Sequence, residues 1–177
     1  MEYTLKNGKN VIVRKVTIND ASSIINIIST ADTETIFLAR NSGEFCITEE
    51  QERIFIGQIL NNDNNEWYVA EYDGKVVGQC SIGLISEYTR YRHRAEISLV
   101  ILKNYWGLGI GGKLIQECIN WCIDRNVIQI ELKVIADNKR AIDLYKAFGF
   151  NTVGIIPKAM RYADDTFADE KLMILEL

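Results

Sequence analysis

Four glycines lie close together in the middle of the chain, at Gly107, Gly109, Gly111 and Gly112, and an apolar pattern with the period of a helix follows them. Glycine lets the backbone adopt positive φ and lets a ligand approach without meeting a Cβ. The first N–H groups of a helix have no partner within it, and the helix dipole places positive charge at that end. Both features favour an anion, so the spacing predicts a phosphate-binding loop.

Several kinds of phosphate site share this glycine spacing. Residues 107–112 satisfy G-x-G-x-x-G, the dinucleotide fingerprint, but too little chain follows Gly112 for the further βα units of a dinucleotide fold. Residues 107–113 also satisfy the first seven positions of a P-loop, but Leu114 stands where a Ser or Thr must hold magnesium. A glycine loop that only turns the chain is the remaining alternative.

A second segment, from Asn138 to Phe150, carries a helix with a clear beginning and end. Asn138 suits the N-cap, and Gly149 suits the position just after the helix. The apolar side chains share one face and are Ala141, Leu144, Tyr145 and Phe148. An ordinary core helix has the same pattern, so this segment indicates a binding site only when it is considered together with the glycine loop.

Together the two segments resemble the GNAT N-acetyltransferases, in the branch of small-amine and ribosomal-protein-alanine acetyltransferases. The family's loop has Gln or Arg, two residues, Gly, one residue, and Gly or Ala, and here these places hold Trp106, Gly109 and Gly111. Its second segment opens with Asn and ends in Tyr, an apolar residue and Gly-Phe. The likeness extends from Val11 to the C-terminus, and Trp106 departs from the usual Gln or Arg.

The resemblance implies acetyl-CoA as the acyl donor and no metal. The backbone N–H groups assigned to its pyrophosphate are those of Leu108, Gly109, Ile110, Gly111, Gly112 and Lys113. The second acetyl-CoA segment contributes Asn138, Ala141 and Tyr145. The peptide-like pantetheine arm would pair with backbone at Val100, Ile101 and Leu102, where an N–H would polarise the thioester carbonyl. The Lys113 side chain would add charge near a phosphate or remain solvated.

Acyl transfer to an amine needs a base for the amine and a proton for the departing thiolate. By the resemblance, Tyr145 is the general acid; protonating a thiolate of pKa ~8.5 from a phenol of pKa ~10 costs about 2 kcal/mol, and water is the alternative donor. Glu96, the only carboxylate in an apolar strand, is the candidate base if burial raises its pKa. The alternative is a strand-entry Glu96 paired with Arg92 or Arg94.

The rest of the chain predicts the elements that position these residues. Strands are expected at Val11–Val13, Trp67–Tyr72, Lys75–Gly83, Ile97–Leu102, Ile128–Ile135, Asn151–Ile156 and Lys171–Glu176. Helices are expected after Thr17, after the capping box of Thr48 and Gln51, after the glycine loop as far as about Arg125, and from Asn138 to Phe148. Asp73-Gly74 predicts a type I′ hairpin turn.

These elements indicate one α/β domain over residues 1–177, a GNAT-type fold with a mixed, strongly twisted sheet of six or seven strands flanked by four helices. By the resemblance, the long loop at residues 31–47 forms one wall of the acceptor site. Loops of this length are often functional.

Composition and charge bear on which classes of partner the protein binds. The net charge of −4 argues against nucleic acid, because phosphate backbones reward basic surfaces. No apolar leader and no membrane-spanning run occur, so we expect a cytoplasmic protein without a membrane partner. Four cysteines without C-x-x-C spacing and a single histidine give no metal site.

The predicted function is transfer of an acetyl group from acetyl-CoA to a primary amine, in a small amine, polyamine or amino-acid-like acceptor, directly within a ternary complex. Two alternatives remain open, a protein N-terminal acetyltransferase and a non-catalytic acetyl-CoA-binding sensor. The resemblance also raises the expectation of a homodimer.

Overall fold

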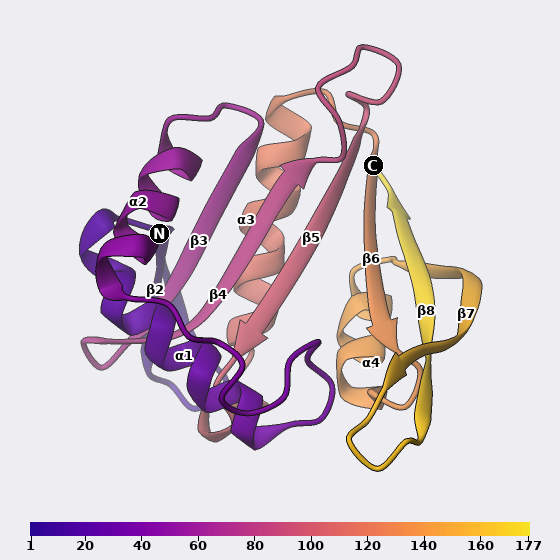
Figure 1. The fold of residues 1–177 in the computed structure, drawn as a ribbon. Coiled ribbons are helices and arrows are strands. Elements are labelled where there is room, and N and C mark those ends of the chain that lie inside the picture. Colours follow the sequence, from indigo (N-terminus) through magenta and orange to yellow (C-terminus); the bar gives the residue numbers. More distant parts are fainter. The chain divides into compact units, whose positions relative to one another are not determined.

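The structure is a computed structural model that describes all residues 1–177, with eight strands and four α-helices (Figure 1). The strands are β1 (Glu2–Thr4), β2 (Asn10–Lys15), β3 (Asn65–Tyr72), β4 (Lys75–Leu84), β5 (Arg94–Ile101), β6 (Gln129–Ile135), β7 (Asn151–Arg161) and β8 (Phe167–Glu176). The helices are α1 (Ala21–Glu34), α2 (Glu49–Leu60), α3 (Ile110–Asp124) and α4 (Lys139–Ala147), with 3₁₀ turns at Ile18–Asp20 and Lys103–Tyr105. None of the helices is long and apolar enough to cross a membrane.

The chain divides into two compact units. Unit 1 comprises Met1–Gly83 and Ile97–Trp121, and unit 2 comprises Leu84–Glu96 and Cys122–Leu177. Strand β5 runs from unit 2 into unit 1, and helix α3 runs from unit 1 into unit 2.

In unit 1, antiparallel β1, β2, β3 and β4 lie side by side in chain order, and the second part of β5 follows β4. Helices α1 and α2 cover one face of these strands, and α3 covers the other (Figure 1). The thiols of Cys80 on β4 and Cys118 on α3 are 3.4 Å apart and buried. The Cys80 side chain therefore points to the face of β4 that α3 covers.

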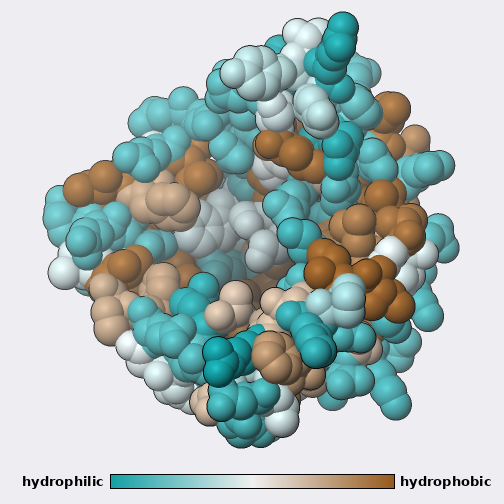
Figure 2. Space-filling view, turned by 45° about the vertical axis from the view of Figure 1, so that its right-hand side comes forward, coloured by the Kyte–Doolittle hydropathy of each residue, from teal (hydrophilic) through white to brown (hydrophobic).

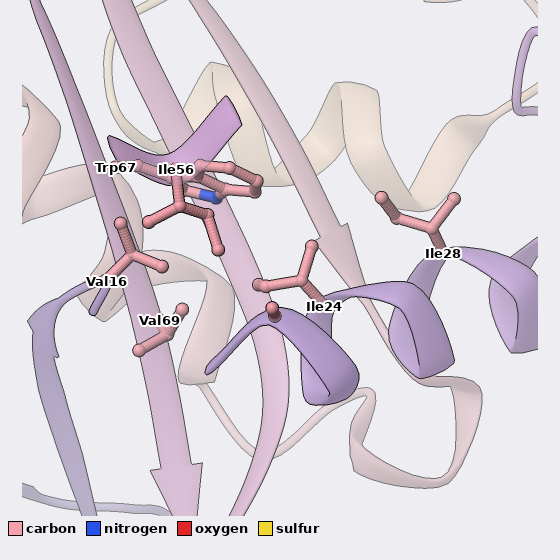
Figure 3. Close-up of a cluster of buried hydrophobic side chains, with 7 residues drawn as sticks. Val16, Ile24, Ile28, Ile56, Trp67 and Val69 are labelled. Atoms are coloured by element: carbon pink, nitrogen blue, oxygen red, sulfur yellow. The ribbon is translucent and has the colours of Figure 1, made fainter. Parts of the chain in front are cut away.

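The core of unit 1 lies between its strands and the α1 and α2 pair. Its buried side chains are Val16, Ala21, Ile24, Ile28, Ile56, Trp67 and Val69 (Figure 3). They come from α1, α2 and β3 and from the residue after β2, so burying them joins the sheet to both helices. Fully burying one such aliphatic or aromatic side chain stabilises the fold by about 1.5–3 kcal/mol.

The local signals in unit 1 are confirmed. Thr48 and Gln51 form the predicted capping box at the start of α2. Thr17 forms a second box with Asp20, so the first helix opens with one 3₁₀ turn before α1. Asp73 and Gly74 have φ of 49° and 72°, as the type I′ turn between β3 and β4 requires.

In unit 2, the first part of β5 pairs with β6 in parallel, and β6, β8 and β7 continue the order with antiparallel pairing. The predicted caps of α4 are confirmed, because Asn138 accepts a hydrogen bond from the Ala141 N–H at 3.2 Å and Gly149 has φ of 93°. Asp164 and Asp165 lie in the turn that connects β7 to β8, and Asp165 has φ of 66°.

Strand β7 extends beyond the predicted Asn151–Ile156 and is interrupted near its middle. The pairing with β8 shifts between Ile156 and Met160, where Lys158 has φ of 52°. The Lys158 N–H donates to the Asp169 carboxylate at 2.8 Å. The strand also exposes apolar side chains, Val153, Ile155 and Ile156. Figure 2 shows hydrophobic side chains set among hydrophilic ones on the face it presents.

The strand count is one or two higher than predicted. The unpredicted strand is β1, which has three residues and pairs with β2. Only Tyr3 within it is partly buried, so a period-two pattern has no room to appear.

Candidate active site

The glycine loop leads directly into α3, as predicted. Gly107 and Gly109 have φ of 79° and 96°, and a Cβ at either position would meet no atom within 4 Å. The Lys113 N–H donates to the Gly109 carbonyl at 3.4 Å as the first bond of the helix. The N–H groups of Ile110, Gly111 and Gly112 therefore have no partner within the helix. The loop offers open space beside a positive helix end.

One of the assigned donors needs correction. The Lys113 N–H was expected to face a phosphate, but the helix already uses it. The carbonyl of Leu108 accepts a bond of 3.4 Å from the Lys6 N–H, so the turn between β1 and β2 touches the loop. The donors that remain are those from Leu108 to Gly112.

Trp106 has a role that the sequence did not show. Its indole Nε1–H donates to the carbonyl oxygen of Ile101 at 2.7 Å. This bond ties the residue just before the glycine loop to the last residue of β5. The side chain at the usual Gln or Arg position therefore fixes the loop to the strand.

The Lys113 side chain lies against the N-terminal strand. Its Nζ is 4.8 Å from the ring centroid of Tyr3, in a cation–π arrangement. The Tyr3 hydroxyl donates to the carboxylate of Glu117, which is only 2% exposed. Burial, together with this bond and the charge of Glu117, raises the pKa of Tyr3 to about 12. The expected solvated or phosphate-facing Lys113 is thus one end of a three-residue cluster, Lys113–Tyr3–Glu117.

The end of β5 lies tightly against β4. The Leu102 N–H donates to the Val77 carbonyl at 3.0 Å. A Cβ on Gly78 would lie 3.2 Å from the Val100 carbonyl oxygen and 3.0 Å from the Ile101 side chain, so any larger residue would push β5 away by a few tenths of an ångström. The pantetheine arm was expected to pair with backbone at Val100–Leu102, and within this stretch the Leu102 N–H is already used by β4.

The loop after α1 is held beside the same end of β5. The Glu34 carboxylate, at the end of α1, accepts a bond from the Lys103 N–H at 2.8 Å. Asp32 is buried and pairs with Arg40 at 3.0 Å. The Arg40 guanidinium lies 5.2 Å from the ring centroid of Phe45, which packs on the core cluster of unit 1. The predicted acceptor wall is therefore an ordered surface of unit 1.

Unit 2 holds the second predicted segment. Tyr145 is 7% exposed, and its ring meets that of Phe150 edge-to-face at 5.6 Å. The Phe150 N–H donates to the Tyr145 carbonyl at 3.1 Å. Asn138 and Ala141 are joined by the capping bond, so Asn138 first serves the helix itself.

Glu96 does not have the environment that was expected for a base. Its neighbours Ala95 and Ile97 are buried, and Glu96 on the opposite face of β5 is exposed rather than partly buried. The alternative pairing with Arg94 is also wrong, because the Arg94 guanidinium bonds to Glu131 of β6. Period-two alternation explains the exposure, since Ala95 and Ile97 occupy the core face.

Among the predicted residues, the structure brings together in unit 1 the stretch Val100–Leu102, Trp106 and the glycine loop. Glu96, Asn138, Ala141 and Tyr145 belong to unit 2. No group of three or more His, Cys, Asp or Glu side chains is arranged to hold a metal ion.

Known acetyltransferases resemble this chain over about half of its length or over nearly all of it. An N-alpha-acetyltransferase from Sulfurisphaera tokodaii is 24% identical over 176 residues, which is 94% of this chain and 96% of that protein. The L-amino acid N-acetyltransferase AaaT of Escherichia coli is 34% identical over 87 residues, covering 49% of this chain and 53% of that protein.

Solved structures share the fold. An acetyltransferase of the GNAT family from Streptococcus pneumoniae is 26% identical with a TM-score of 0.88, covering 94% of this chain and 99% of that one. A GNAT superfamily phosphinothricin acetyltransferase from Sinorhizobium meliloti, solved in complex with acetyl-CoA, is 20% identical with a TM-score of 0.82, covering 94% and 88%. The family described as "Acetyltransferase (GNAT) family" matches residues 30–150, more than half of the chain. With its glycine loop, its α3 start and this match, the chain belongs to the GNAT family of acetyltransferases.

Proposed function

We propose that this acyltransferase moves the acetyl group of acetyl-CoA to the primary amine of a small amine, polyamine or amino-acid-like acceptor, directly within a ternary complex. The observation that carries the proposal is the open glycine loop at the start of α3, fixed to β5 by Trp106. Acetyl-CoA fits this loop because its pyrophosphate is an anion that free helix N–H groups bind. The phosphinothricin acetyltransferase of this fold binds the same molecule.

The donor thioester would be held by the end of β5. In an antiparallel pair, the N–H and C=O of one residue point to the same neighbour, and those of the next residue point away. Because the Leu102 N–H points to β4, the Ile101 N–H points away from it. The Ile101 carbonyl is already engaged by Trp106, so its N–H is the group that remains to polarise the thioester carbonyl.

Tyr145 is the proposed general acid for the departing thiolate. Its ring is packed against Phe150 and its backbone is tied to the end of α4, so its position is well defined. A defined position matters because proton transfer requires hydrogen-bond reach. The general base is not assigned to a residue, because the Glu96 side chain is exposed to solvent. Solvent water is the simplest proton acceptor for the amine.

A protein N-terminus is the second candidate acceptor. The N-alpha-acetyltransferase of Sulfurisphaera tokodaii covers this chain almost completely, whereas the amino-acid acetyltransferase covers half of it. A sensor that binds acetyl-CoA without turnover is the third. The homodimer expected from the family stays a prediction.

The test is release of free thiol from acetyl-CoA with a panel of polyamines, amino acids and short peptides, beside calorimetric titration with CoA. Turnover with small amines supports the proposal, and turnover with peptides alone supports the second candidate. Tight CoA binding without any turnover supports the third candidate, a sensor that binds acetyl-CoA. Absence of both binding and turnover overturns the acetyl-CoA proposal. Tyr145→Phe should bind CoA with unchanged affinity while transfer slows.

A further inference from the structure

Gln79, on β4, is a buried polar side chain whose hydrogen bonding is incomplete. It is 8% exposed, and its Oε1 has no hydrogen-bond partner. Leaving such an acceptor unsatisfied costs about 1–3 kcal/mol, so a buried orphan needs an explanation. The oxygen requires a donor, and a bound ligand is one source of it.

Gln79 lies beside the stretch that is proposed to hold the thioester. Strands β4 and β5 run in opposite directions (Figure 1). The Leu102 N–H bonds to the Val77 carbonyl, and Gly78 approaches Val100 and Ile101 closely. In antiparallel register, Gln79 is therefore level with Val100.

The side chain of Gln79 points to the α1 and α2 face of unit 1. Its partner on β3 is Val69, which belongs to the core cluster under these helices. Residues directly opposite in an antiparallel pair share a face. Cys80, the next residue, contacts Cys118 of α3 on the other face.

The acceptor wall belongs to the same part of unit 1. The end of α1 reaches the residue after Leu102 through the bond between Glu34 and Lys103. The loop that follows α1 is held by Asp32 and Arg40. An amine that arrives along this loop at the end of β5 approaches on the α1 side of the sheet, which is also the side to which the buried Gln79 oxygen points.

We infer that Gln79 binds the acceptor: its Oε1 accepts a hydrogen bond from the primary amine and holds the nitrogen beside the acetyl group at Val100–Leu102. This assignment rests on the proposed acetyl transfer. A primary amine carries N–H donors that satisfy the orphan acceptor. A neutral amide suits this task, because a carboxylate in its place would favour the charged, non-nucleophilic ammonium form.

Two variants test the assignment. Gln79→Met keeps an unbranched side chain of similar size and removes the acceptor, and we expect KM for the amine to rise about tenfold. The Kd for CoA and the melting temperature should stay unchanged or improve, since no orphan remains. Ser81→Ala is the matched control, because Ser81 lies two residues further along the same face of β4 and pairs with Trp67. It should leave KM within twofold.

Gln79→Glu gives an independent readout. The carboxylate stabilises the bound ammonium, so the pH at which kcat reaches half of its plateau should move upward by about one unit. A purely structural role for Gln79 would change stability without moving this midpoint.

The outcomes separate the two proposals. Unchanged KM in Gln79→Met, or a loss of CoA affinity equal to the loss for the amine, overturns the role of Gln79 and leaves acetyl transfer standing. An unmoved pH midpoint in Gln79→Glu overturns it as well. If the wild-type protein transfers acetyl to no amine, the proposed function fails and the role of Gln79 fails with it.

Discussion

The indole of Trp106 and the carbonyl of Ile101 are joined by a hydrogen bond of 2.7 Å that closes the short 3₁₀ segment between β5 and the glycine loop. The loop position thus depends on a single side-chain donor. The GNAT family usually has Gln or Arg at this place, whereas this chain uses a side chain that reaches backward to the strand.

Removing that donor should loosen the loop. Trp106→Phe keeps an aromatic ring but leaves the Ile101 carbonyl without its partner, so we expect CoA affinity to fall about five- to tenfold, which corresponds to about 1 kcal/mol. Calorimetric titration measures this. Tyr105→Phe, one residue earlier, retains the ring that meets Tyr72 edge-to-face and should change affinity less than twofold. Equal affinities for all three proteins would show that the bond does not position the loop.

Gly109 should be sensitive to conformation rather than to crowding. An added Cβ meets nothing within 4 Å, but φ of 96° is unfavourable for any other residue. We expect Gly109→Ala to lose about 1–2 kcal/mol in stability and to weaken CoA binding. Gly57→Ala is the control, since Gly57 lies within α2 and also has open space. It should stabilise the protein by about 0.5–1 kcal/mol in urea unfolding. The same sign for both variants would contradict this account.

The bond between Tyr3 and Glu117 should stabilise the N-terminal strand on α3. Tyr3→Phe leaves a buried carboxylate without its donor, and we expect a loss of about 1–3 kcal/mol in urea unfolding at pH 7. The ring stays in place for Lys113. Tyr88→Phe, at an exposed position, should have no effect.

The same pair predicts a dependence on pH. The pKa of Tyr3 is raised in the folded state to about 12, so the neutral phenol is the stabilising form. Its contribution is fully present below the unfolded pKa of about 10 and is lost as pH rises through the folded value. The stability difference between wild type and Tyr3→Phe should therefore be constant below about pH 10 and shrink above it. A difference that grows above pH 10 would rule this out.

Glu52 should make the protein less stable at neutral pH. It is 2% exposed, its Oε1 has no partner, and burial raises its pKa. A raised folded pKa means that the neutral carboxyl favours folding below the unfolded pKa, and that this benefit is lost as pH rises through the folded value. Glu52→Gln should thus be more stable than wild type at pH 7, by about 1 kcal/mol. The advantage should shrink toward pH 4. Urea unfolding at the two pH values checks this, with Glu50→Gln at an exposed position of α2 as control.

Features written in a few neighbouring residues were predictable. The Asn138 cap, the Gly149 terminus and the Asp73-Gly74 turn follow from local backbone rules, and all three occur. The glycine loop belongs to this group, since the positive φ of Gly107 and Gly109 is a property of its own backbone. These signals do not depend on which distant residues are nearby.

Features that depend on distant partners were not predictable. The bond of Trp106 to Ile101 requires a 3₁₀ turn that brings the indole ring close to the end of β5. The place of Gln79 beside Val100 follows only from the register of β4 with β5. Glu96 was predicted to be partly buried because the strand is apolar at most positions. In such a strand the sequence does not show which face points to solvent. The position of the Lys113 side chain was not predicted, because it depends on Tyr3 of β1. That strand has only three residues, too few for a recognisable strand pattern.

The interruption in β7 lies on an edge strand of the sheet and breaks the regularity of that edge. A long strand at a sheet edge presents a row of unpaired backbone groups on which another chain can assemble into aggregates, and apolar Val153 and Ile155 would increase that tendency. Pro157 has no N–H, and the N–H of Lys158 is held by Asp169. An incoming strand therefore meets an edge whose regular row of backbone groups is interrupted between Ile156 and Met160.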